Sequence, residues 1–181
     1  MEHADHIGLI RDGVAGAGRR WLELGAGHGA FTLALADLLG PDAEIVAIDR
    51  NAGDLRRLDA TMADRFPGTR LRTVVADFME PIELGDQPFD GLLAANALHF
   101  VRDPASVLDR FRPMLKDAAR VIVVEYDADS GNPWVPHPFS FRSWQTIAAA
   151  VRLSDPRLIG RVPSRFLGAI YAAASDVAPD S

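Results

Sequence analysis

The strongest constraint on the fold of this chain is the alternation of short apolar segments with segments of helical periodicity. Apolar runs typical of strands are followed by stretches in which apolar residues recur every three or four positions. Because parallel neighbours need a crossover connection, this order predicts βαβ units and a parallel sheet. The predicted strands are 21–24, 45–48, 71–75, 89–95 and 121–124, and the predicted helices are 4–14, 30–39, 51–66 and 104–115.

The pattern changes after the fifth predicted strand. A proline-rich loop, residues 127–139, leads to a further helix and then to two strands, 157–162 and 165–174. Only Pro163–Ser164 separates these strands, and so short a link cannot join parallel neighbours. We therefore predict an α/β fold whose mostly parallel sheet ends in an antiparallel hairpin.

Length and composition favour one globular domain. The chain has 181 residues, of which 48% are hydrophobic and 24% charged, and no low-complexity segment divides it. We predict a single domain over residues 1–181, with the N-terminal helix 4–14 packed on it. No apolar run approaches the ~20 residues of a membrane span, and charges interrupt the N-terminal segment where a signal peptide needs an apolar core. A cytoplasmic protein without a membrane partner is expected.

Charge and residue usage exclude several function classes. The net charge of −6 gives the protein no general attraction to phosphate backbones, so nucleic acid is not an expected partner. The absence of cysteine excludes disulfides, thiolate nucleophiles and cysteine zinc sites. Lys116 is the single lysine, so any Schiff-base chemistry would depend on it. The oligomeric state is left open by these observations.

A glycine-rich turn follows the first predicted strand. Residues 23–29 read Glu-Leu-Gly-Ala-Gly-His-Gly, and Ala30 completes the looser dinucleotide pattern G-x-G-x-x-A. Glycines at this spacing let the backbone turn tightly and approach a ligand. In an open α/β sheet such a turn lies at the carboxyl ends of the strands, where ligands bind. The turn is a candidate binding site, and a purely structural turn is the alternative.

Acidic residues end the next two predicted strands. Asp49 can accept hydrogen bonds from both hydroxyls of a ribose. The alternative is that Asp49 caps the following helix, but Asn51 already suits that role. Asp77 can accept the exocyclic amine of adenine while Phe78 packs on the ring; a turn aspartate and a core phenylalanine are the alternatives. Glu23 would repel a pyrophosphate but attract a ligand that carries an ammonium and a sulfonium. These charges favour a sulfonium nucleoside over a dinucleotide.

Together these motifs resemble class I S-adenosylmethionine-dependent methyltransferases. Residues 23–29 are similar to the first motif of that family, residues 89–100 to its fourth, and the terminal hairpin to its reversed seventh strand. The resemblance covers about residues 21–175 and implies a Rossmann-like, doubly wound seven-stranded sheet, mostly parallel with an antiparallel C-terminal strand. It also implies S-adenosylmethionine as the cofactor. The cofactor-binding residues that it implies are Glu23, Gly25, Ala26, Gly27, Gly29, Asp49, Arg50, Asp77, Phe78, Ala94 and Asn96.

The resemblance extends to small bacterial methyltransferase-domain proteins of undefined substrate. Family members that methylate amino groups of adenine or glutamine carry an Asn-Pro-Pro-Tyr-type fourth motif. Here Asn96 is followed by Ala97 and Leu98, which counts against that subclass.

Three side chains are candidate catalytic bases. His99 follows the fourth predicted strand, and Glu125 and Tyr126 end the fifth, so all three are expected near the methyl group. A packed histidine and a loop-orienting glutamate are the alternatives for His99 and Glu125. A base is not obligatory, since alignment of the reactants alone supplies effective molarities of roughly 10⁵–10⁸ M.

No metal site is expected. Asp127 and Asp129 resemble the start of a calcium-binding loop, but Gly131 stands where the third ligand belongs and Pro138 occupies the twelfth position.

The expected function is methyl transfer from S-adenosylmethionine to a small-molecule acceptor, because the chain leaves little room for macromolecular recognition. An NAD(P)-binding oxidoreductase is one alternative; it would explain the glycines and Asp49 but neither Glu23 nor Asp77. A non-catalytic module that binds S-adenosylmethionine is the other, because cofactor motifs do not prove turnover.

Overall fold

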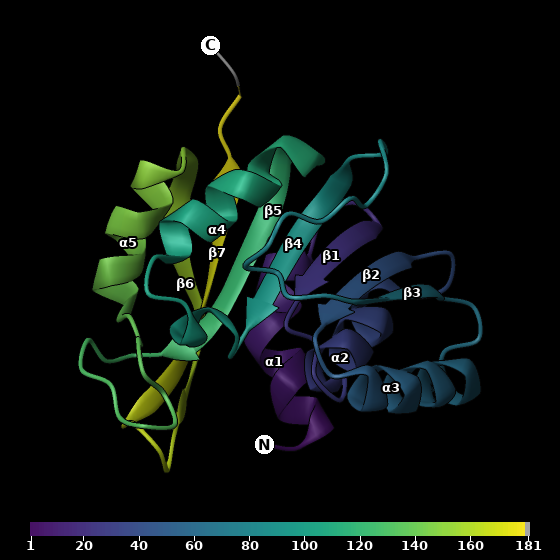
Figure 1. Ribbon diagram of the computed structural model, residues 1–181, viewed down its shortest axis with the longest axis horizontal. Helices are drawn as coiled ribbons and strands as arrows, with labels where there is room; N and C mark the ends of the chain where they lie inside the picture. The colour runs from purple at the N-terminus through teal and green to yellow at the C-terminus, as the bar shows by residue number, and fades with distance from the viewer. Residues whose placement is uncertain (180–181) are drawn as a thin grey trace.

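The computed structural model describes residues 1–179 of the chain, and its elements follow the predicted alternation (Figure 1). The helices are α1 His3–Val14, α2 Ala30–Leu39, α3 Ala52–Arg65, α4 Pro104–Phe111 and α5 Phe141–Ala150, with single 3₁₀ turns η1 Leu98–Phe100 and η2 Arg112–Met114. The strands are β1 Arg20–Leu24, β2 Glu44–Asp49, β3 Arg70–Val75, β4 Phe89–Ala95, β5 Leu115–Tyr126, β6 Leu153–Pro163 and β7 Ala169–Val177.

Within residues 1–179, seven strands form one sheet in the order β3-β2-β1-β4-β5-β7-β6. Strands β1 to β5 pair in parallel, and β7 runs antiparallel to both of its neighbours, β5 and β6. The predicted fold class is therefore confirmed. The chain moves outward from β1 to β3 and then returns to β4 on the other side of β1. This reversal places the topological switch point, where open α/β sheets bind ligands, between β1 and β4.

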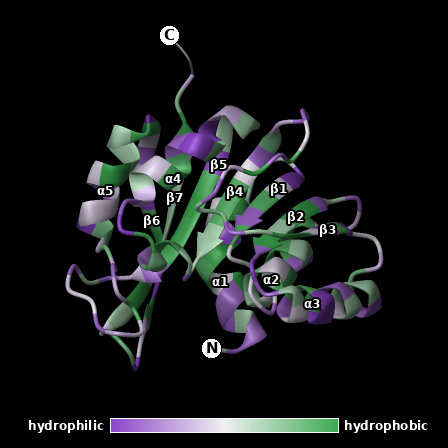
Figure 2. Cartoon of the chain, viewed as in Figure 1, coloured by the Kyte–Doolittle hydropathy of each residue, from purple (hydrophilic) through white to green (hydrophobic). Residues whose placement is uncertain are grey.

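The sheet is covered on both faces (Figure 1). An apolar cluster beneath α1, α2 and α3 fills one side, and a second cluster beneath α4 and α5 fills the other. The central strands are accordingly the most apolar parts of the ribbon (Figure 2), because a parallel strand buried on both faces needs apolar side chains throughout. Trp21 and Trp144 are fully buried, one in each cluster. Burial of a large apolar side chain contributes roughly 1.5–3 kcal/mol.

The helix predicted to reach Leu115 ends earlier than expected. As an α-helix it stops at Phe111, and the chain passes through η2 into β5. The reason is Pro113, which has no backbone N–H to donate and whose ring excludes the preceding turn of an α-helix. Strand β5 consequently begins at Leu115, well before the predicted start at Val121.

The terminal hairpin is antiparallel, as predicted, but its predicted two-residue link is wrong. Strand β6 already begins at Leu153, and residues 164–168 join it to β7. The turn is closed by a hydrogen bond of 2.8 Å from the Ser164 N–H to the Gly168 carbonyl. Gly168 has a φ of 57°, a conformation that glycine adopts at no steric cost.

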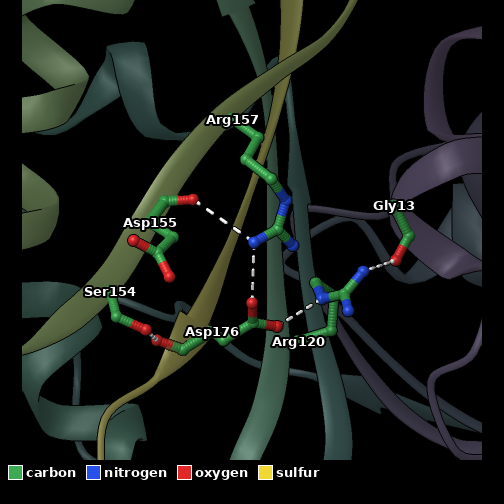
Figure 3. Close-up of polar contacts among 6 residues, drawn as sticks. All are labelled: Gly13, Arg120, Ser154, Asp155, Arg157 and Asp176. Carbon is green, nitrogen blue, oxygen red and sulfur yellow. Dashed lines mark hydrogen bonds and ion pairs between the residues drawn. The ribbon is translucent and has the colours of Figure 1, made fainter.

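A polar network ties the C-terminal end of α1 to the antiparallel part of the sheet (Figure 3). Arg120 of β5 donates one hydrogen bond of 2.6 Å to Asp176 of β7 and another of 2.6 Å to the Gly13 carbonyl. Arg157 of β6 donates a further bond of 2.9 Å to Asp176. Burial raises the pKa of Asp176, but the hydrogen bonds from the two arginines outweigh it and hold the pKa below its usual value. The network thus fixes α1 against the sheet through charge-assisted bonds.

No helix within residues 1–179 is long and apolar enough to cross a membrane.

Candidate active site

A cavity of about 290 Å³ lies at the carboxyl ends of the parallel strands, in the loops after β1, β2, β3 and β4. Seven of the predicted cofactor-binding residues share its wall. They are Gly25, Gly27, Asp49, Arg50, Asp77, Phe78 and Asn96. The loops therefore bring together residues that stand far apart in the sequence, at the switch point where the fold predicts a ligand site.

Four other predicted cofactor residues do not line this cavity. Glu23 is buried in β1, and Ala94 is fully buried in β4. Ala26 and Gly29 belong to the glycine turn but do not line the cavity. The three candidate bases, His99, Glu125 and Tyr126, lie beside the cavity and do not line it either.

Sequence reasoning missed six lining residues: Asn51, Asp54, Ala76, Met79, Ala97 and Phe100. The sequence did contain a signal for Asp54. This residue is in the first turn of the helix that follows the strand ending at Asp49, so it lies at the same edge of the sheet as Asp49. No comparable signal existed for Phe100. Apolar spacing does not reveal that this residue of the cavity wall is 55% exposed.

The glycines of the turn serve different purposes. Gly25 has a φ of 71°, and a Cβ atom on it would lie 2.6 Å from the Cβ of Ala97. Gly29 has a φ of 91°, and a Cβ atom on it would clash with Cδ1 of Leu58 in α3. Gly25 thus lets the turn approach the segment after β4, whereas Gly29 lets the turn pack on α3.

Asp49 organises the turn that it faces. Its Oδ2 accepts a hydrogen bond of 2.8 Å from the Gly27 N–H, and its Oδ1 accepts one of 2.8 Å from the Asn51 N–H. Asn51 in turn caps α3 by accepting from the N–H groups of Gly53 and Asp54. The cap therefore belongs to Asn51, and the Asp49 carboxylate keeps lone pairs for further donors, since it can accept about four bonds.

Asn96, a residue of the cavity wall, carries a buried acceptor without a partner. Its backbone has a φ of 52°, and its N–H donates to the Val124 carbonyl at 2.7 Å. Its side-chain Oδ1 is buried, has no hydrogen-bond partner and belongs to a residue of the cavity wall. A buried acceptor without a partner costs ~1–3 kcal/mol, so a ligand that donates an N–H there would be stabilised.

The charges around the cavity are mainly negative. Asp49, Asp54 and Asp77 line it, against the single cation of Arg50. Asp77 is held by a hydrogen bond of 2.9 Å from the Met79 N–H to its Oδ1. Like charges repel and opposite charges attract at short range. The wall therefore favours a cationic ligand with hydroxyl and amine donors over a pyrophosphate.

Glu23 lies beneath the glycine turn and is 2% exposed. Its Oε2 accepts a hydrogen bond of 2.5 Å from the Thr32 hydroxyl. Burial raises the pKa of Glu23 to about 7; the Thr32 hydrogen bond opposes this rise and the nearby Asp49 adds to it. Both the neutral and the charged form of this side chain are therefore populated near neutral pH.

This raised pKa predicts a pH-dependent stability. The native state keeps a proton on Glu23 that the unfolded state releases, so the free energy of unfolding should fall as pH rises from 4.5 to 7. Over this range the ionisation of Glu23 should lower the free energy of unfolding by on the order of 3 kcal/mol. Urea unfolding at pH 5, 6 and 7 measures it, and Glu23→Gln should remove most of the slope. The exposed Glu83→Gln is the control, and an unchanged slope in Glu23→Gln would refute the assignment.

The two aspartates of the calcium-like segment have other partners. Asp129 accepts hydrogen bonds from the Ser140 N–H and hydroxyl and from the Ser143 hydroxyl. Asp127 accepts from the Phe141 N–H. Both carboxylates therefore fix the start of α5. In the part of the chain that the structure describes, no group of three or more potential ligands is arranged to hold a metal ion.

Comparison with known proteins agrees with this architecture. The sequence profile of the family described as "Methyltransferase domain" matches residues 16–155, well over half of the chain. The chain is 27% identical over 136 residues to the ubiquinone/menaquinone biosynthesis C-methyltransferase of Ectopseudomonas mendocina. That match covers 75% of this chain and 52% of the relative, so the chain spans about half the length of the curated relatives it matches.

Solved structures share the fold. The YcgJ protein from Bacillus subtilis has a TM-score of 0.76 at 14% identity, over 98% of this chain and all of that one. A SAM-dependent methyltransferase from Aquifex aeolicus has a TM-score of 0.72 at 17% identity, over 96% and 89% of the two chains.

The fold defines the class: a Rossmann-like methyltransferase domain with a carboxylate-lined cavity at the switch point. The chain belongs to the methyltransferase-domain family, and the class I S-adenosylmethionine-dependent methyltransferase recognised from the sequence is confirmed. The cofactor of this class is S-adenosylmethionine.

Proposed function

We propose that this chain transfers the methyl group of S-adenosylmethionine to a small-molecule acceptor. The observation that carries the proposal is the cavity at the switch point, where three carboxylates and the unpartnered Oδ1 of Asn96 meet. A sulfonium nucleoside offers the donors and the positive charge that such a wall requires. The curated relatives are named as C-methyltransferases that act in biosynthesis, which supports a small-molecule acceptor.

Each part of the wall suits one part of the cofactor. Asp49 would accept the ribose hydroxyls, and Asp77 the adenine amine with Phe78 against the ring. Asn96 Oδ1 would accept an N–H of the ammonium group, while the turn at Gly25 and Gly27 leaves room for the backbone to approach the ligand. Glu23, Ala26, Gly29 and Ala94 would support the wall from behind. When bound, S-adenosylmethionine supplies a methyl carbon already activated by the sulfonium.

The chain itself contributes alignment. Holding the acceptor in line with the methyl carbon makes the reaction effectively unimolecular. Such orientation lowers the activation free energy by roughly 7–11 kcal/mol in favourable cases. The half-exposed Phe100, together with Ala97 and Met79, contributes apolar surface to the cavity wall. That surface suits an acceptor with an apolar ring.

Two alternatives compete with this proposal. An NAD(P)-binding oxidoreductase would have to place a pyrophosphate against the carboxylates of the cavity wall, which is electrostatically unfavourable. A non-catalytic module would bind the cofactor without turnover. We further propose a single domain over residues 1–181, of which the last two lie outside the described residues, in a cytoplasmic protein without nucleic-acid partners.

Calorimetric titration with S-adenosylhomocysteine, with NADH as the comparison, tests the cofactor assignment. We expect micromolar binding of S-adenosylhomocysteine and none of NADH. Binding of NADH alone would overturn the proposal in favour of hydride transfer. Binding of S-adenosylhomocysteine without methyl transfer to any compound in a small-molecule screen would favour the non-catalytic module.

A further inference from the structure

A buried carboxylate–imidazole pair lies beside the cavity. Nδ1 of His99, in η1, is 2.8 Å from Oε2 of Glu125, near the end of β5. His99 is 3% exposed and Glu125 is fully buried. Taking a carboxylate out of water costs several kcal/mol unless hydrogen bonds compensate it. An apolar residue would fill the same space without that cost, so the pair calls for an explanation beyond packing.

Glu125 holds more than the imidazole ring. Its Oε1 accepts hydrogen bonds of 2.9 Å from the Leu98 N–H and 3.2 Å from the His99 N–H. The carboxylate therefore fixes both the backbone and the side chain of His99 to a strand in the middle of the sheet. A histidine held through both its ring and its backbone by one carboxylate is oriented more strictly than packing alone would require.

This geometry selects one tautomer of His99. A carboxylate only accepts hydrogen bonds, so Nδ1 carries the proton that it donates to Glu125. The lone pair of the neutral ring then resides on Nε2. The arrangement is that of an oriented general base.

The ring connects to the cavity through Phe100. The ring centroids of His99 and Phe100 are 4.2 Å apart, and Phe100 is the half-exposed aromatic residue of the cavity wall. His99 is almost fully buried directly behind this residue of the cavity wall. On another side, Tyr126 meets His99 edge-on at 5.5 Å. Burial and the charge of Glu125 raise the pKa of Tyr126, so its hydroxyl stays protonated near neutral pH and is a poor base.

We infer that Glu125 is a positioning residue that orients His99 as the base for a phenolic or enolic acceptor, whose hydroxyl proton His99 removes. The inference rests on the proposed function. Nε2 takes the proton as the hydroxyl oxygen forms a bond to the methyl carbon. The bond from that carbon to sulfur breaks, and its electron pair stays on sulfur. His99 then releases the proton to solvent. Among the three predicted bases, His99 alone receives the proton.

The variant Glu125→Gln separates orientation from folding. The amide oxygen of glutamine can still accept the N–H groups of Leu98 and His99, so the turn should persist. The amide N–H₂, however, must donate to Nδ1, which moves the imidazole proton to Nε2. Nitrogen-15 correlation spectra of His99 at pH 8 should show protonated Nδ1 in the wild type and protonated Nε2 in Glu125→Gln. The same tautomer in both proteins would overturn the positioning role.

Methyl transfer to phenol and to 4-nitrophenol, assayed at pH 8.5, tests the base itself. 4-Nitrophenol is already ionised at this pH and needs no base, whereas phenol does. Glu125→Gln and His99→Gln should lose about 10²–10⁴-fold in rate with phenol and only a few-fold with 4-nitrophenol. Equal losses on both acceptors, or no loss, would overturn the inference. The exposed Glu83→Gln should behave as the wild type.

Measuring the binding of S-adenosylhomocysteine distinguishes a failure of the His99 base from a failure of the proposed methyltransferase function. Wild-type protein that binds S-adenosylhomocysteine but methylates neither phenol nor 4-nitrophenol would overturn the hydroxyl acceptor and leave the cofactor assignment standing. Protein that does not bind S-adenosylhomocysteine would overturn the proposed function.

Discussion

Replacing Asp49 with alanine is expected to weaken the binding of S-adenosylhomocysteine by ~10–100-fold, as two charge-assisted hydrogen bonds of ~1.5–3 kcal/mol each allow. The carboxylate would hold the ribose, and it also accepts the N–H groups of Gly27 and Asn51 at 2.8 Å each. Its removal therefore affects the ligand and the turn that faces the ligand. Isothermal calorimetry of the folded variant measures the change.

Two further variants sharpen this prediction. Asp49→Asn keeps one accepting oxygen but replaces the other with an amide N–H₂ group, which cannot accept the second backbone N–H; it should fall between alanine and the wild type. The exposed Asp64→Ala, near the end of α3, should bind normally. Unchanged affinity in Asp49→Ala would remove Asp49 from the site.

Replacing Gly25 with alanine is expected to lower S-adenosylhomocysteine affinity at least tenfold. The backbone at Gly25 is left-handed, with a φ of 71°, which costs a residue with a Cβ roughly 1–2 kcal/mol. The new Cβ would also lie 2.6 Å from that of Ala97, so one side of the cavity must shift. Calorimetry for binding and thermal unfolding for stability distinguish the two effects.

Gly16→Ala is the matched control for this prediction. Gly16 has a φ of 77°, and a Cβ there meets nothing within 4 Å. It follows α1 and is absent from the cavity wall. The variant should therefore lose stability through backbone strain alone and keep its affinity for S-adenosylhomocysteine. Equal affinity losses in Gly16→Ala and Gly25→Ala would show that the effect is general strain and not the geometry of the turn.

The order of the elements and much of the cavity wall could be predicted from the sequence alone. Periodicity of 2 and of 3.6 residues reports local burial, and Asn51 and the Gly40–Pro41 pair mark helix ends by local chemistry. Asp49 and Asp77 could be assigned because the carboxyl ends of parallel strands necessarily meet at one edge of a sheet. These features depend on neighbours in the chain or on topology alone.

Which side chains line the cavity and which lie behind its wall depends on how the strands and helices pack in three dimensions. Glu23 and Asp49 both stand at the ends of strands, yet Glu23 is buried against Thr32 and Asp49 is at the surface of the cavity. Likewise, the pairing of His99 with Glu125 joins residues that are 26 positions apart. A local pattern carries no information about the depth of a side chain below a turn or about its partner on another strand. Those properties arise from how β1, β4 and β5 pack side by side and from what covers them.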